Sequence, residues 1–144
     1  MKVSMIMSTL GRTEEVLHFI DALKQMEHGD FELIIVDQNP DGRLCKACAS
    51  LAPGFPLQCL ASPRARGVSR GRNLGASKAS GEILCFPDDD CIYPPALLGK
   101  VLRCFLETGA DIVCGRAAAP DGRSINGPFE NSPMRVDMRK VFTT

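Results

Sequence analysis

Three consecutive carboxylates are the residues in this sequence with the clearest capacity for chemistry. Asp88, Asp89 and Asp90 follow an apolar run, residues 83–86, that predicts a buried strand. Carboxylates that leave a strand together lie at a sheet edge, where two of them about 6 Å apart repel by about 3 kcal/mol at an effective dielectric of about 20. Hard oxygen ligands suit Mg²⁺ or Mn²⁺ carrying a diphosphate, and such a cation relieves the repulsion. The alternative is a solvated turn before the prolines at 94 and 95.

A cluster of arginines is the second feature. Within residues 64–75 the chain carries four of them: Arg64, Arg66, Arg70 and Arg72. They lie at the start of a helix of small residues, whose N-terminal N–H groups also favour anions, and guanidinium groups suit phosphate oxygens. A solvated or RNA-binding loop is the alternative. Because 17 Lys and Arg balance 17 Asp and Glu, and no aromatic residue is interleaved for base stacking, we expect no nucleic-acid partner.

An acidic residue also ends the second predicted strand. Asp37 follows the apolar run 31–36, and a carboxylate at this position can accept hydrogen bonds from a base or a ribose. An aspartate before Asn39, Pro40, Asp41 and Gly42 also suits a tight turn. The sequence leaves both interpretations of Asp37 open.

The seven cysteines do not form a recognisable pattern. Cys45 and Cys48 have the C-x-x-C spacing of zinc sites, but no second pair follows and neither His18 nor His28 stands at a finger-like offset. The odd count, in a chain with no secretion signal, argues against a disulfide framework. We interpret the cysteines as structural or incidental.

Continuous apolar runs predict a parallel sheet that is covered on both faces. The predicted strands are Val3–Met7, Phe31–Val36, Leu57–Leu60 and Ile83–Phe86, with a fifth candidate at Asp111–Cys114. Helices are expected between them, over residues 13–26, 44–51, 69–79 and 94–108. This alternation predicts an α/β fold with three α/β/α layers and an open, mostly parallel sheet. The length of 144 residues fits one such domain.

Neither end of the sequence predicts a membrane segment. No apolar stretch approaches the roughly 20 residues that span a bilayer, and the apolar N-terminal run is strand-length with no small-residue cleavage site after it. We therefore expect a cytoplasmic protein. Attachment to the inner face of the membrane through residues outside this chain stays open.

Four segments together carry a resemblance to a known family. They are an opening strand and turn (Val3–Arg12), a strand with a terminal acid (Glu32–Asp37), a small-Arg-Asn-x-Gly helix start (Gly71–Gly75) and a D-x-D signature after a small-Gly-Glu strand entry (Ser80–Asp90). In this order they resemble the inverting family 2 glycosyltransferases of the GT-A fold. Pro87 departs from the pattern, because the family often has a larger apolar residue there.

The resemblance implies a metal-dependent transfer of a sugar, with inversion, from a nucleotide-diphospho-sugar, foremost a UDP-sugar. The acceptor, whether a glycan, a lipid-linked group or a small molecule, is not indicated. Mg²⁺ or Mn²⁺ is the implied cofactor, with Asp88 and Asp90 as its ligands. The implied donor-binding residues are Thr9, Arg12, Asp37, Arg72, Asn73, Asp88 and Asp89.

The resemblance covers residues 3 to about 98 and leaves the catalytic base unknown. Residues 1–115 are expected to bind the nucleotide-sugar, and residues 116–144 to be a tail or the start of an acceptor-side region, so that the fold looks incomplete at its C-terminus. Glu130 and Asp137 are available acids without a family-like context. A missing acceptor half would uncover apolar surface near residues 112–142 and invite self-association. The alternatives are a noncatalytic nucleotide or nucleotide-sugar binding domain and a protein-interaction module.

Overall fold

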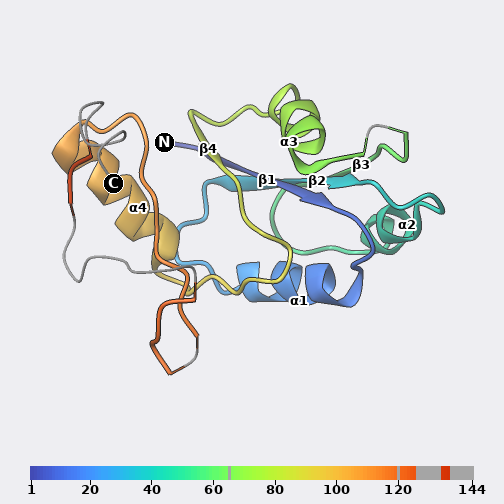
Figure 1. Cartoon of the computed structure of the whole chain (residues 1–144), viewed down its shortest axis with the longest axis horizontal. Helices are drawn as coiled ribbons and strands as arrows, with labels where there is room; N and C mark the ends of the chain where they lie inside the picture. Colours follow the sequence, from blue (N-terminus) through green and yellow to red (C-terminus); the bar gives the residue numbers. More distant parts are fainter. Residues whose placement is uncertain (65, 120, 126–133, 137–144) are drawn as a thin grey trace. The chain divides into compact units, whose positions relative to one another are not determined.

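The first 109 residues form an alternating α/β unit. The computed structural model describes residues 1–64, 66–119, 121–125 and 134–136, and it divides the chain into two compact units, Met1–Gly109 and Ala110–Thr144. The elements of the first unit are β1 (Val3–Thr9), α1 (Glu14–Leu23), β2 (Phe31–Asp37), α2 (Arg43–Ala49), β3 (Leu57–Ala61), α3 (Val68–Ala76), β4 (Ile83–Cys85) and α4 (Leu97–Thr108) (Figure 1). The predicted alternation is confirmed through its fourth helix.

All four strands are parallel, in the order β3-β2-β1-β4. β1 and β2 are in register from Val3 opposite Phe31 to Thr9 opposite Asp37, so these two strands end level. β1, β2 and β3 each continue past the predicted apolar run, because the backbone ladder extends to Thr9, Asp37 and Ala61. Thr9 and Asp37 therefore belong to the sheet rather than to the loops after it.

Side-chain alternation along the strands builds two apolar layers. Met5, Met7, Leu33 and Ile35 share one face of the sheet, because residues two apart on a strand point the same way. They pack into one cluster with residues of α1, α2 and α4: Val16, Phe19, Ile20, Leu23, Leu44, Leu98 and Leu102. Figure 1 shows α1 and α2 on this side of the sheet and α3 on the other. The three layers agree with the predicted fold class.

Two glycines let α3 approach the sheet closely. A Cβ at Gly71 would overlap the side chain of Ser8, and a Cβ at Gly75 would overlap that of Ile6. The small residues of this helix are thus required by its contact with β1, as the sequence suggested. That contact places the arginine-rich helix start above the ends of β1 and β2.

Gly75→Ala is expected to lower the free energy of unfolding by about 1–3 kcal/mol, because the added methyl overpacks a buried contact with Ile6. The matched control is Gly99→Ala, since Gly99 lies in α4 with open space around its Cβ position. The Gly99→Ala control should raise the free energy of unfolding by up to about 1 kcal/mol, because alanine has a higher helix propensity than glycine. Urea denaturation of both variants measures the difference. Equal stability of Gly75→Ala and wild type would contradict the close packing of α3.

A partly buried carboxylate, that of Glu32, holds the opposite, N-terminal end of the sheet together. Glu32 of β2 accepts hydrogen bonds at Oε1 from Ser4 Oγ at 2.6 Å and from Ser80 N at 2.8 Å, and at Oε2 from Lys2 Nζ at 3.2 Å. Burial alone would raise the pKa of Glu32, but these hydrogen bonds outweigh it and lower the pKa to about 2. One side chain thus joins β1, β2 and the loop before β4.

This lowered pKa predicts a pH-dependent contribution to stability. With an unfolded value near 4.5, the ionised Glu32 stabilises the fold above that pH, and the contribution is lost as the pH falls from there toward 2. This contribution of ionised Glu32 to the free energy of unfolding is roughly 3 kcal/mol. Denaturation of wild type and Glu32→Gln at about pH 6 and about pH 3 should show the difference between them shrinking in acid. A difference that does not change with pH would contradict this assignment.

The fifth predicted strand does not form in the described residues. Residues 111–114 have no strand geometry, and Ile112 is 79% exposed. A short apolar run becomes a strand only where a neighbouring strand completes its ladder, and local sequence cannot supply that neighbour. The second unit instead has an isolated antiparallel bridge between Ala118 and Ser124. Glu130 and Asp137 lie outside the described residues.

No helix in the described ranges is both long enough and apolar enough to cross a membrane.

Candidate functional site

The carboxyl ends of β1 and β4 bring the aspartate triplet against the first strand. Thr9, the last residue of β1, donates a hydrogen bond from Oγ1 to Asp89 Oδ2 at 2.6 Å. Thr9 is buried and Asp89 is half-buried, whereas Asp88 and Asp90 are exposed. The aspartates thus meet the end of β1 at the sheet edge, where ligands bind in open α/β folds.

One arginine neutralises two of the three aspartates. Arg12, between β1 and α1, places Nη1 2.9 Å from Asp89 Oδ1 and 2.7 Å from Asp90 Oδ2. The hydrogen bond from Arg12 lowers the pKa of Asp90, and the same bond raises the pKa of Arg12. The structure therefore groups Asp89 with Asp90 around a single cationic group, whereas the resemblance paired Asp88 with Asp90.

Asp88 has a different arginine as its partner. Arg72 of α3 contacts Asp88 Oδ1 through Nη2 at 3.1 Å, and its guanidinium carbon lies 5.7 Å from the centre of the Phe86 ring. The Nε atom of Arg72 is buried and has no hydrogen-bond partner within the described part of the chain. This N–H is therefore available to a ligand atom. The remaining members of the basic segment are exposed: Arg64, Arg66, Arg70 and Asn73.

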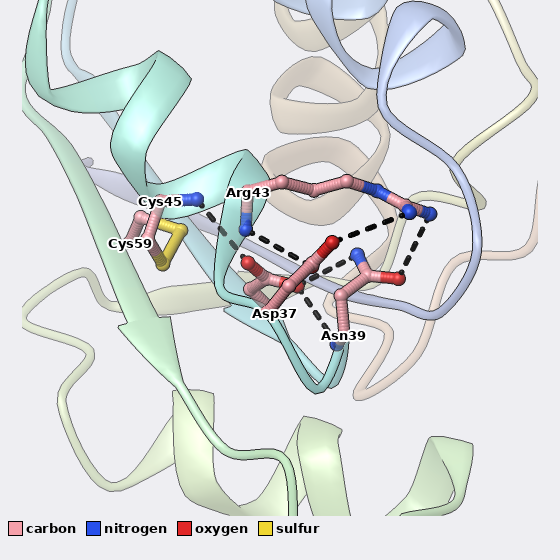
Figure 2. The surroundings of a disulfide bond; sticks show 6 residues. Asp37, Asn39, Arg43, Cys45 and Cys59 are labelled. Atoms are coloured by element: carbon pink, nitrogen blue, oxygen red, sulfur yellow. Dashed lines mark hydrogen bonds and ion pairs between the residues drawn. A yellow bond between two sulfur atoms is a disulfide. The ribbon is translucent and has the colours of Figure 1, made fainter.

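Asp37 lies at the same sheet edge, but its carboxylate is hydrogen-bonded to residues that follow it closely in the chain (Figure 2). The side chain is fully buried; Oδ1 accepts from Asn39 N at 2.9 Å and from Asn39 Nδ2 at 2.8 Å, and Oδ2 accepts from Cys45 N at 3.2 Å. These contacts are the ones expected if Asp37 stabilises the tight turn that follows β2. A contact between Asp37 and a nucleotide base stays a prediction.

Asn39 links this turn to the segment that carries Arg12. Its Oδ1 accepts from Gly11 N at 2.7 Å and from Arg43 Nη2 at 3.3 Å, and Arg43 Nη2 also donates to Gly11 O at 3.0 Å. Figure 2 shows Arg43 reaching across to Asn39 from the start of α2. Both backbone groups of Gly11 are therefore held by side chains, one from the loop after β2 and one from the start of α2.

A disulfide joins Cys45, near the start of α2, to Cys59 of β3, with 5.2 Å between their Cα atoms (Figure 2). The odd cysteine count argued against disulfides, and this expectation was wrong for Cys45 and Cys59. Cys48, the other member of the C-x-x-C spacing, is a free and buried thiol. Cys59 stands 14 residues from Cys45, and only the packing of α2 on β3 brings them together. One carboxylate oxygen of Asp37 lies within 4.8 Å of both sulfurs. Because the sulfurs are bonded to each other, we interpret the group as a covalent clamp on this loop.

The disulfide predicts five free thiols per chain in unfolded, unreduced protein and seven after reduction. A Cys45→Ala/Cys59→Ala variant should lose about 3 kcal/mol of stability, the amount expected for a loop of about 15 residues. Cys104→Ala, which removes a free cysteine on α4, is the control. Thiol counting with a chromogenic disulfide and urea denaturation provide the two measurements. Seven reactive thiols before reduction would rule the bond out.

Gln38 contributes to the site although the sequence did not single it out. Its side chain donates to Gly67 O and accepts from Gly67 N, both at 3.1 Å, and this pair positions the start of α3 over the end of β2. Gly67 adopts a φ of +111°, which disfavours other residues. The available signal was a run of three polar residues, 37–39, directly after a buried strand.

Comparisons with known proteins identify the family. A relative from Pyrococcus furiosus, a dolichol-phosphate mannosyltransferase, is 25% identical over 130 residues, which are 90% of this chain and 37% of the relative. The chain therefore spans little more than a third of that relative's length.

Two solved structures share the fold. Staphylococcus aureus TarS 1–349 superposes with a TM-score of 0.76 at 19% identity, over 88% of this chain and 39% of TarS. The mannosyltransferase PcManGT of Pyrobaculum calidifontis, in complex with GDP-Man and Mn²⁺, superposes with a TM-score of 0.65 at 21% identity, over 72% of this chain and 32% of PcManGT. These likenesses confirm the GT-A fold. The model of the family described as Glycosyl transferase family 2 matches residues 4–137, so the chain belongs to that family.

Proposed function

We propose that this chain binds the donor in an inverting, metal-dependent glycosyltransferase that uses a nucleotide-diphospho-sugar. The observation that carries the proposal is the convergence of Thr9, Arg12, Asp89 and Asp90 at the carboxyl edge of a parallel sheet. Support comes from the family match and from the ligands of the structural neighbours: TarS has been solved with UDP-GlcNAc and PcManGT with GDP-Man and Mn²⁺.

The donor atoms at this edge fit a divalent cation. Asp89 and Asp90 offer hard carboxylate oxygens that already converge on one positive group, and Asp88 extends from the same loop. We propose Asp90 as a ligand, with a second carboxylate from Asp88 or Asp89. Bound Mg²⁺ or Mn²⁺ would act there as a Lewis acid and stabilise the departing nucleoside diphosphate.

The protein's own groups would bind and orient the nucleotide around that centre. The buried, unpartnered Nε of Arg72 can donate to a phosphate oxygen, and a cation–π contact with Phe86 helps to position its guanidinium. Asn73 follows it on α3 and completes the proposed diphosphate contact. Asp37, two strands away from the triplet at the same edge, would shape the base side of the pocket, and uracil is the proposed base.

Transfer with inversion also requires a base within hydrogen-bond reach of the acceptor hydroxyl. None of the described residues is assigned to that step, and the acceptor is likewise unassigned.

The test is a binding panel of uridine, guanosine and adenosine diphosphates with and without Mn²⁺, followed by incubation with the matching nucleotide-sugars and mixed acceptors. We expect metal-dependent binding, with the uridine nucleotide bound most tightly. Turnover of a donor sugar would separate an enzyme from a noncatalytic binding domain. If none of the diphosphates binds, the donor-binding proposal is wrong and an interaction module becomes the better explanation of the fold.

A further inference from the structure

We propose that Arg12 is an internal counter-cation: in the nucleotide-free protein its guanidinium occupies the carboxylate site and opposes metal binding until a nucleoside diphosphate draws it away. The inference rests on the proposed function and adds to it a coupling between the binding of the metal and the binding of the nucleotide. Metal and nucleotide would enter together, because each removes the obstacle to the other.

The geometry puts the guanidinium in direct competition with a metal. A single nitrogen, Nη1, lies within 2.9 Å of one oxygen of Asp89 and 2.7 Å of one oxygen of Asp90. These two carboxylates are also the hard oxygen ligands that would hold a divalent cation. A divalent ion bound to these oxygens would therefore lie beside the guanidinium, and the two cations would repel each other and compete for the same carboxylates.

The Asp89 carboxylate would remain in place when the guanidinium leaves. Thr9 Oγ1 holds the other oxygen of Asp89 at 2.6 Å, and Thr9 itself is fixed in the ladder of β1. Within the described residues, the ion pairs of the Arg12 guanidinium are those with Asp89 and Asp90, and its side chain is 38% exposed. One cation can therefore replace the other at Asp89 without moving that carboxylate.

The backbone beside Arg12 is fixed, so only the side chain needs to move. Gly11 N donates to Asn39 Oδ1 at 2.7 Å, and Gly11 O accepts from Arg43 Nη2 at 3.0 Å. Rotation about the side-chain bonds of Arg12 swings the guanidinium while these hydrogen bonds stay intact. Arg72 is less free to move in this way, because its guanidinium also makes a cation–π contact with Phe86, 5.7 Å from the ring centre.

Charge balance explains why the nucleotide would trigger the exchange. A divalent ion that binds alone must give up bound water. It must also displace a guanidinium that is covalently attached to the chain and therefore binds the aspartates without losing translational freedom. A diphosphate supplies oxygen ligands for the metal and a new anionic partner for Arg12, and guanidinium groups bind phosphate well. Linkage then requires that the nucleotide and the metal raise each other's affinity by the same factor.

The test measures Mn²⁺ binding by the paramagnetic resonance of free Mn²⁺ in nucleotide-free protein, for wild type, Arg12→Gln and Arg12→Lys. Arg103→Gln, which removes an exposed arginine of α4, controls for net charge. We expect Arg12→Gln to bind Mn²⁺ about tenfold more tightly than wild type, and Arg12→Lys and Arg103→Gln to stay near wild type. Adding uridine diphosphate should tighten Mn²⁺ binding in wild type far more than in Arg12→Gln.

Two results would overturn the inference in distinguishable ways. Unchanged or weaker Mn²⁺ binding by Arg12→Gln, with metal-dependent binding of uridine diphosphate intact in wild type, would refute the counter-cation and leave the proposed function standing. If no protein in the set binds uridine diphosphate with Mn²⁺, the proposed function fails as well, and the contacts of Arg12 form only a surface ion pair.

Discussion

Asp90→Asn is expected to weaken binding of a nucleoside diphosphate with Mn²⁺ by roughly a hundredfold and to leave metal-free binding nearly unchanged. The carboxylate of Asp90 is a proposed metal ligand, and a neutral amide oxygen is a much poorer ligand for a hard cation. Asp89 would still hold Arg12, through the contact at 2.9 Å, so the rest of the site should keep its arrangement. Calorimetric titrations with and without Mn²⁺ measure both affinities.

The same substitution should not lower the melting temperature. The Asp90 side chain is 53% exposed, and ion pairs of such groups contribute at most about 1 kcal/mol. Losing one of three adjacent negative charges also relieves repulsion. Asp21→Asn is the matched control, because Asp21 is likewise an exposed carboxylate in a short ion pair, with Lys24 at 2.6 Å. A large loss of stability in Asp90→Asn, with nucleotide affinity unchanged, would make the triplet structural.

Asp37→Ala should have the largest effect on the base side of the site. Asp37 is fully buried and accepts three hydrogen bonds from Asn39 and Cys45, so its removal leaves buried donors unpaired at about 1–3 kcal/mol each. We expect a clear loss of stability and an about tenfold weaker binding of uridine diphosphate, with or without metal. Denaturation and calorimetry on the same preparations give the two numbers.

Two further variants separate a contact with the base from a general loosening of the loop. Asp37→Asn keeps one acceptor oxygen and should fall between wild type and alanine in stability. The Cys45→Ala/Cys59→Ala variant releases the clamp on α2 and keeps the carboxylate, so it should retain more nucleotide affinity than Asp37→Ala. If wild type and both Asp37 variants bind uridine diphosphate equally, Asp37 serves the turn alone.

The strands and their order along the chain could be predicted because the signal is local. Residues 3–7, 31–36, 57–60 and 83–86 are mainly apolar without a strict polar alternation, which is typical when helices cover both sides of a parallel sheet. Once parallel strands are assumed, their polar termini must meet at one edge. That argument correctly brought Thr9, Asp37 and the triplet to the same edge of the sheet.

The pairings within the site could not be predicted, because they depend on packing between distant segments. Arg12 is separated from Asp89 by 77 residues, and nothing in the sequence indicates that its guanidinium reaches two aspartates rather than solvent. The bond between Cys45 and Cys59 likewise depends on how α2 lies against β3. The interpretation of Asp37 was open for a related reason: the direction of its carboxylate is set by Asn39 and by the backbone N–H of Cys45.

The most direct test of the proposed donor site is a calorimetric titration of uridine diphosphate into the wild-type chain, once with excess Mn²⁺ and once with a chelator. The convergence of Thr9, Arg12, Asp89 and Asp90 predicts one binding site per chain that is occupied with Mn²⁺ and loses most of its affinity when the metal is chelated. Affinity that is the same in both titrations, or no binding in either, would contradict a metal-dependent donor site at this edge of the sheet.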